Sequence, residues 1–302
     1  MAIYFFQTQP VSRADGRTAT AAAAYRAGER IRDEASGRLY NHAGRRDVAH
    51  KEILLPSGLV APEWARDRAQ LWNAAERAEG RSNSRVAREY LVALPGELDA
   101  GRRLQLARTF AREISDRYRV AVDLAIHEPR AGGDPRNHHA HLLATTRELS
   151  AAGLGAKAGL EMHSEGRAAQ GLYRSGIDEL VAIRERWATL ANGALHEAGL
   201  AVRIDHRTLA AQGIEREPAA RIPWGAYRME REGLRSEVAE RVRASYAARV
   251  ATRRERLAPT RESPGQDLES VRAQARREWS ARQASAERGA ERTPEKDHGL
   301  EL

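Results

Sequence analysis

The chain has 302 residues, of which 30% are charged and 5% aromatic, and its net charge at pH 7 is +8. This length suffices for one large hydrophobic core or two modest ones. The absence of cysteine excludes disulfides and thiolate metal sites, and no apolar run approaches the roughly 18 residues of a membrane span. Because the start of the chain also lacks the features of a signal peptide, we expect a cytoplasmic protein with no membrane insertion.

The predicted elements run in chain order as strand, helix, hairpin, helix, strand, helix, strand, strand. Helices follow from apolar residues that recur every three or four positions, and strands from short apolar runs that end at proline or glycine. The ranges are 2–8, 18–34, 36–42 paired with 50–56, 62–79, 88–95, 99–118, 120–129 and 138–146. This order is typical of the α+β class, with helices packed on a mainly antiparallel sheet.

A further helix is predicted from a capping box at Ser175 and Asp178 to about Glu197. Its inward residues should be Ile177, Leu180, Trp187, Leu190 and Ala194. Beyond it the apolar stripe becomes thin, and the end of the chain has the composition of a disordered segment. We therefore expect a domain of residues 1–220, a helical extension 221–257, and a disordered or partner-binding tail 258–302.

The basic residues are almost all arginine, because only Lys51, Lys157 and Lys296 of the 50 are lysines. The planar guanidinium of arginine suits phosphate, and the sequence pI near 10.1 favours a polyanionic partner. A GC-rich genome and ion pairs on helix surfaces explain the same composition, so these counts do not name the partner.

Four of the ten histidines lie between residues 127 and 141. Because side chains alternate along a strand, His139 and His141 share one face and His138 points to the other. If the preceding strand pairs with this one as a hairpin, His127 lies beside that pair. Three imidazoles would then converge with open coordination positions, as in a catalytic metal site. The alternative interpretation is a solvated pair of histidines on a strand face, and the other histidines, His42 among them, show no ligand spacing.

Three stretches of the sequence resemble the MobA/MobL family of plasmid mobilisation relaxases, which are single-strand endonucleases with a histidine–hydrophobe–histidine motif. They are MAIYFFQTQPVSRADGRTATAAAAYRAGERI, AIHEPRAGGDPRNHHAHLL and RIDHRTLAAQGIE. The resemblance spans roughly residues 1–220. It implies a five-stranded, mainly antiparallel sheet with helices on its face, which agrees with the class predicted from the residues themselves.

The resemblance also implies a role for the site residues. Tyr25 would be the nucleophile, and His127, His139 and His141 would hold a divalent metal ion. Magnesium or manganese follows from the resemblance, whereas imidazole ligands intrinsically favour ions such as zinc, nickel or cobalt. The phenol would attack a phosphate of one strand at an origin of transfer, retain the 5′ phosphate, and leave a 3′ hydroxyl that later reseals the strand.

Each of the remaining site residues has a structural alternative. Tyr25 has only small residues as helical neighbours, which also fits close helix packing, and the substitutes for it are Tyr4, Tyr40 and Tyr90. Glu89 is expected to orient a metal ligand or accept the tyrosine proton, with Asp123 as a rival and an exposed edge charge as the alternative. Some relatives carry a second acid where this chain has Leu91. Candidate DNA contacts are Arg13, Arg17 and Arg26.

The expected function is thus a relaxase that nicks and reseals one strand at a plasmid origin of transfer. The partners implied are single-stranded origin DNA, accessory mobilisation proteins, and a coupling protein with a type IV secretion channel that carries the protein to the recipient cell. One alternative is a rolling-circle replication initiator, although such proteins usually place the tyrosine after the histidines. The others are a non-catalytic origin-binding protein and a metal phosphohydrolase for small molecules.

Overall fold

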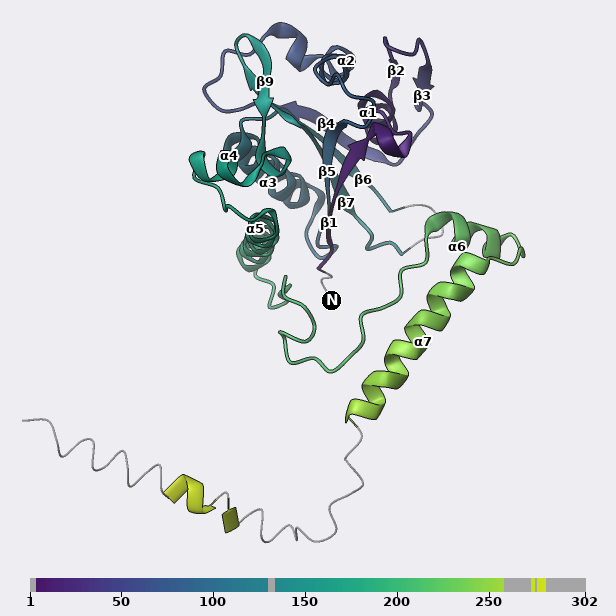
Figure 1. Ribbon diagram of the computed structural model, residues 1–302, viewed down its shortest axis with the longest axis vertical. Helices are drawn as coiled ribbons and strands as arrows, with labels where there is room; N and C mark the ends of the chain where they lie inside the picture. The colour runs from purple at the N-terminus through teal and green to yellow at the C-terminus, as the bar shows by residue number, and fades with distance from the viewer. Residues whose placement is uncertain (1–3, 130–133, 258–272, 275, 281–302) are drawn as a thin grey trace, which may run out of the picture. The chain divides into compact units, whose positions relative to one another are not determined.

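The computed structural model describes residues 4–129, 134–257, 273–274 and 276–280 (Figure 1). The chain divides into two compact units, Met1–Gly213 and Ile214–Leu302. The domain boundaries expected after residues 220 and 257 stay predictions. The tail expected to be disordered, 258–302, lies almost wholly outside the described residues.

A five-stranded sheet organises the first unit, with strand order β1-β5-β7-β6-β4. Its strands are β1 (Phe6–Ser12), β4 (Val48–Leu54), β5 (Arg85–Ala93), β6 (Val122–His127) and β7 (His139–Thr145). All neighbouring strands are antiparallel, and β6 and β7 pair as the hairpin expected from the histidine spacing. The predicted α+β fold with a five-stranded antiparallel sheet is confirmed.

Helices pack on both faces of this sheet (Figure 1). Alternate strand residues such as Tyr90, Leu124 and Leu142 share one core with α3 (Ala100–Tyr118) and α5 (Gly176–Glu197). The opposite core contains Leu143 together with residues of α1 (Ala19–Ala27) and α2 (Arg68–Arg77). Because side chains alternate along a strand, the odd-numbered residues of β5, β6 and β7, which include the histidines, face α1 and α2.

Two local predictions at the start of the chain are wrong. The helix expected over 18–34 ends at Ala27, because Gly28 adopts the left-handed conformation (φ 60°) and its N–H bonds to the Ala24 carbonyl. The chain then forms β2 (Arg30–Arg32), which pairs with β3 (Leu39–Asn41). The expected hairpin of 36–42 with 50–56 therefore does not form, and β4 pairs with β6 instead.

The remaining elements of the first unit are short. They are β8 (Arg147–Ser150), β9 (Gly153–Lys157), α4 (Ser164–Ala169) and the 3-10 helices η1 (Arg13–Asp15), η2 (Glu63–Arg66) and η3 (Gly159–Glu161). The inward position predicted for Ile177 is wrong, since its side chain is 75% exposed in the first turn of α5, whereas Trp187 further along is fully buried.

The second unit contains α6 (Trp224–Arg231) and α7 (Glu237–Leu257). Ala226 of α6 and Ala239 of α7 are buried, while Met229 and Val238 are largely exposed. Within the part of the chain that the structure describes, no helix is long and apolar enough to cross a membrane.

Candidate metal centre and nucleophile

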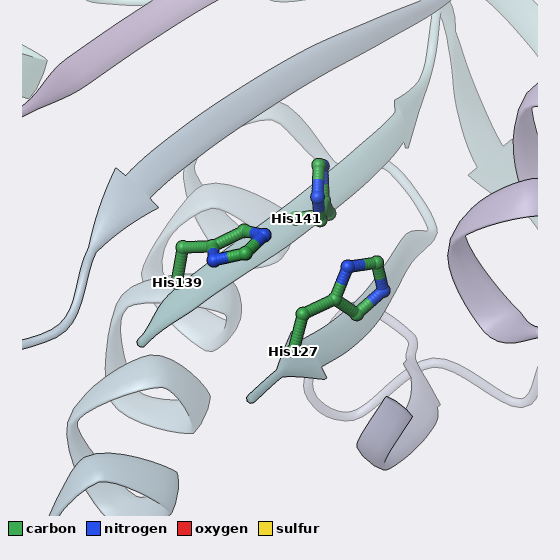
Figure 2. Close-up of side chains that lie close together, drawn as sticks. All are labelled: His127, His139 and His141. Atoms are coloured by element: carbon green, nitrogen blue, oxygen red, sulfur yellow. The ribbon is translucent and has the colours of Figure 1, made fainter. Parts of the chain in front are cut away.

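The register of the β6–β7 hairpin brings three histidines together on one face of the sheet. His127 lies directly opposite His139, and His141 lies opposite Ala125 two pairs further along. The ring centroids are 4.6–5.2 Å apart, and one nitrogen from each ring lies within 4.8 Å of the other two. Figure 2 shows the three rings facing a shared space. This is the convergence expected from the sequence.

The other nitrogen of each ring is bound to an oxygen. His127 Nε2 lies 2.7 Å from the Arg26 carbonyl, His139 Nδ1 lies 3.0 Å from the Asn137 carbonyl, and His141 Nδ1 lies 2.7 Å from Glu89 Oε1. Since these oxygens only accept, the facing nitrogens carry the hydrogen in the neutral rings. The lone pairs then sit on His127 Nδ1, His139 Nε2 and His141 Nε2. Histidines that bind metals are typically held in this way, so the donor set fits a metal ion.

Electrostatics favour the neutral form of two of the three histidines, His127 and His141. Burial, together with the neighbouring His141, lowers the pKa of His127 to about 3. Burial also lowers the pKa of His141, although its hydrogen bond to Glu89 opposes this. Neutral imidazole is the form that binds a metal, so at physiological pH these two histidines have the protonation state that a cation requires.

Glu89 is the carboxylate that supports this cluster. Its side chain is 2% exposed on β5, an interior strand, so the alternative of an exposed edge charge is wrong. Besides His141, it accepts hydrogen bonds from Arg26 Nε at 2.6 Å and from Gln9 Nε2 at 2.7 Å. Burial raises the pKa of Glu89, but the bonds from His141 and Arg26 outweigh it and hold the pKa well below its usual range.

Asp123, the rival candidate, serves a different group of residues. Its carboxylate accepts two hydrogen bonds from Arg68, at 2.8 and 2.9 Å, and one from Trp72 Nε1 at 2.9 Å. These partners lie on α2, so Asp123 ties that helix to β6. Of the two acids, only Glu89 is hydrogen-bonded to one of the three histidines.

Tyr25 lies near the end of α1 with 40% of its surface exposed. Its ring packs edge-on against the His42 ring, with centroids 5.3 Å apart, and the Arg45 Cζ lies 4.2 Å from its centroid. The same guanidinium lies next to the group of three histidines, because Arg45 Nη2 is 3.3 Å from His127 Nδ1. The residue after Tyr25 contributes the carbonyl that holds His127. Arg45 therefore contacts both the predicted nucleophile and one of the predicted metal ligands.

His42 and Arg45 are site residues that the sequence did not reveal. In the sequence, His42 is not spaced from other histidines as metal ligands are, and Arg45 lies in a turn between two predicted strands. They reach Tyr25 because β2 and β3 pair and return the chain to the end of α1. No local pattern could have shown this contact.

The other tyrosines considered as nucleophiles lie in different surroundings. Tyr90 is 2% exposed in the core shared with α3 and α5, on the opposite face of the sheet from the histidines. The Tyr4 hydroxyl donates to the Arg184 carbonyl. Tyr40 lies on β3, and its ring packs beneath the guanidinium of Arg38.

The three arginines proposed as DNA contacts differ in their roles. Arg26 is buried, with Nε bonded to Glu89 and Nη1 bonded to the Ala22 carbonyl at 2.8 Å, so it supports the carboxylate that holds His141. Arg13 directs its guanidinium to the Glu76 carboxylate and to backbone carbonyls near the end of α2. Arg17 donates to the Pro10 carbonyl at 3.4 Å. Contact of any of them with DNA stays a prediction.

An apolar cavity of about 380 Å3 opens beside His139. Phe5, Leu91 and Ala93 line one part of it, and Arg136 and Asn137 line another. Leu91 lies opposite His141 in the β5–β7 register. Leu91 is therefore part of an apolar wall next to the candidate metal centre.

Residues 17–232 match the sequence profile of the MobA/MobL family. The chain belongs to this family. It is 38% identical over 256 residues to mobilization protein MobL of Acidithiobacillus ferridurans, covering 76% of this chain and 64% of that protein. It is 36% identical over 247 residues to mobilization protein A of Escherichia coli, covering 80% of this chain and 32% of that protein. The chain thus spans less than two thirds of either relative.

The chain is also similar to a solved structure. It is described as the molecular basis of vancomycin resistance transfer in Staphylococcus aureus, and it matches with a TM-score of 0.56 and 31% identity. The match covers 68% of this chain and 100% of the other. The fold described above is therefore one that this solved relative shares.

Proposed function

We propose that this MobA/MobL chain contains the nicking domain of a DNA relaxase, which cuts one strand at an origin of transfer and holds the 5′ end on Tyr25. The observation that carries the proposal is the single cluster formed by Tyr25, Arg45 and the three histidines. The names of the two mobilization proteins and the description of the Staphylococcus aureus structure support a role in DNA transfer between cells.

The reaction is a transesterification. The Tyr25 oxygen forms a bond to phosphorus while the bond from phosphorus to the 3′ oxygen of the preceding nucleotide breaks, and that oxygen leaves with the electron pair. The phenolic proton passes to solvent and the leaving oxygen takes up a proton, so no water is consumed. Because one phosphodiester replaces another, the 3′ hydroxyl can attack in reverse and reseal the strand. The substrate must be single-stranded near the cut, since in-line attack requires an accessible phosphate.

His127 Nδ1, His139 Nε2 and His141 Nε2 are the atoms that would hold a divalent metal ion. Such an ion polarises a phosphate oxygen as a Lewis acid. Magnesium or manganese follows from the family, and zinc, nickel or cobalt from the ligand type. Glu89 orients His141, and its three accepted hydrogen bonds make it a positioning residue rather than the acceptor of the tyrosine proton.

The remaining parts of the proposal rest on the family. The protein would act in the cytoplasm together with accessory mobilisation proteins. It would then pass with its DNA through a coupling protein and a type IV secretion channel. The order of the motifs favours a relaxase over a rolling-circle initiator, because Tyr25 precedes the histidines.

The test uses labelled single strands that tile the DNA beside the gene, incubated with purified protein and a divalent metal ion. We expect a covalent adduct on a denaturing protein gel that is lost on protease digestion, with a chelator, and in Tyr25→Phe. Tyr40→Phe is a matched control that should still form the adduct. Binding of DNA without any adduct would instead support a non-catalytic origin-binding protein.

A further inference from the structure

The connection between β3 and β4 is fixed against the end of the helix that carries Tyr25. The His42 N–H donates to the Glu29 carbonyl at 3.0 Å, and the Glu128 N–H donates to the Asp47 carbonyl at 2.8 Å. Glu128 directly follows His127. The 42–47 segment is therefore tied both to the α1 terminus and to the strand that carries a metal ligand.

Gly28 makes this close approach feasible. A Cβ at this position would lie 3.1 Å from Val48 Cγ2 and 3.4 Å from Arg45 Cβ. Gly28 also has φ +60°, which disfavours other residues. The backbone at the end of α1 thus sets the position of Arg45 relative to Tyr25.

One guanidinium contacts several parts of the proposed reaction centre. Arg45 Nη1 donates to the Tyr25 carbonyl at 2.7 Å, and its Cζ lies 4.2 Å from the Tyr25 ring centroid. The fork Nε and Nη2 binds both oxygens of Asp47, with Nε 2.9 Å from Oδ1, and Nη2 also lies 3.3 Å from His127 Nδ1. The hydrogen bond from Arg45 lowers the pKa of Asp47 to about 2, so this counter-charge persists across the physiological range.

We propose that Arg45, held by Asp47, is a positioning residue for strand transfer, which fixes the Tyr25 ring beside the metal centre; this rests on the proposed function. An exposed tyrosine at a helix end has several accessible rotamers. Packing between the Arg45 guanidinium and the His42 ring restricts them. The side chain of Arg45 is only 14% exposed, so its fixed charge also acts on the developing phenolate with little solvent screening.

The contact with His127 means that a positioning role for Arg45 can be distinguished from a purely structural one by measuring metal affinity and cleavage separately. The Arg45 charge lies beside the nitrogen that faces the shared metal space, and like charges repel. Removing Arg45 should therefore leave metal affinity unchanged or increase it while slowing cleavage. Local collapse of the site would weaken metal binding and cleavage together.

The experiment compares Arg45→Ala with Arg46→Ala, which removes the adjacent exposed arginine and the same charge. Three quantities are measured on the full chain: Mn2+ affinity without DNA by calorimetry, the dissociation constant for the cleavable strand in a Tyr25→Phe background, and the single-turnover cleavage rate at saturating DNA. We expect Arg45→Ala to slow cleavage about 100-fold, because small misplacement of a nucleophile has an effect of this size. DNA affinity should change less than about 3-fold, and Mn2+ should bind at least as tightly as to the wild type.

Two further variants complete the test. Guanidinium ion at tens of millimolar should partly restore cleavage by Arg45→Ala, and Arg45→Lys, which keeps the charge without the fork, should have an intermediate rate. An unchanged cleavage rate in Arg45→Ala, a slow rate with weakened Mn2+ binding, or a defect confined to DNA affinity would each overturn the inference. If the wild type forms no adduct, the proposed function fails and this inference with it. If the wild type forms the adduct and Arg45→Ala forms it equally fast, only this inference fails.

Discussion

Replacing Glu89 with glutamine tests how the metal centre is held. In the native protein, Oε1 accepts from His141 and Arg26, and Oε2 accepts from Gln9. A glutamine of the same size offers one acceptor oxygen and an amino group that only donates. If the oxygen takes the place of Oε1, the amino group faces Gln9, which then loses its acceptor. In either orientation His141 and Arg26 lose the negative charge of the carboxylate.

The expected magnitudes follow from the burial of this group. Removing a carboxylate that orients a metal-binding histidine costs about 10- to 100-fold in metal affinity, which corresponds to about 1.4–2.7 kcal/mol. The side chains of Arg26 and Glu89 are 10% and 2% exposed. Because Arg26 would keep a buried charge without its counter-ion, we expect the free energy of unfolding to fall by about 3–5 kcal/mol.

The assay combines calorimetric titration with Mn2+ and chemical unfolding without metal. Glu161→Gln is the matched control, since this side chain is 4% exposed and pairs with Arg85 and Arg88 rather than with a histidine. The control should lose stability and keep its metal affinity. A folded Glu89→Gln protein that binds Mn2+ as tightly as the wild type would refute the role assigned to Glu89.

Three further predictions concern other parts of the first unit. His139→Ala removes one of three ligands, so metal-dependent stabilisation against heat should disappear; persistence of that stabilisation would contradict the ligand set. Gly28→Ala should reduce the free energy of unfolding by about 1 kcal/mol or more. The loss should exceed that of Gly16→Ala, where φ is also positive but no atom lies within 4 Å of the added Cβ. Equal losses in the two variants would show that Arg45 does not pack tightly against Gly28. Although burial raises the pKa of Glu79, hydrogen bonds from Lys157 and Arg147 lower it overall, so its stabilising effect is present above the unfolded-state pKa of about 4.3 and is lost as pH falls through the folded pKa. Glu79→Gln should therefore lower the free energy of unfolding by about 1–2 kcal/mol at pH 7, with a difference that vanishes in acid, and a loss that is independent of pH would contradict this.

The parts of the fold that could be predicted are those governed by local patterns. Apolar periodicity identified α3, and the Pro95-Gly96 pair marked the end of β5. The two-residue alternation in β7, together with the adjacent strand of similar length, was enough to place His127, His139 and His141 on one face. These features depend on neighbours in sequence or on a single hairpin.

The features that could not be predicted depend on tertiary contacts. Alanines that favour helix precede Gly28, and the charged residues after it do not by themselves end a helix. The end of α1 is therefore set by the left-handed backbone of Gly28, against which Val48 and Arg45 pack closely. Tertiary packing also decides which strand pairs with β3. From the sequence pattern alone β4 can pair with β3 or with β6, and in the structure it pairs with β6 while β3 pairs with β2. The contact of Arg45 with Tyr25 follows from both, and this is why the sequence did not reveal it.

The most direct measurement is mass spectrometry of the DNA-linked peptide after the covalent adduct has been digested with trypsin. Cleavage after Arg17 and Arg26 releases residues 18–26, in which Tyr25 is the single tyrosine. We predict that this peptide carries the 5′-phosphorylated nucleotide from the nick. A nucleotide attached to a peptide that contains Tyr4, Tyr40 or Tyr90, or a cut strand with no attached peptide, would contradict the assignment of the nucleophile.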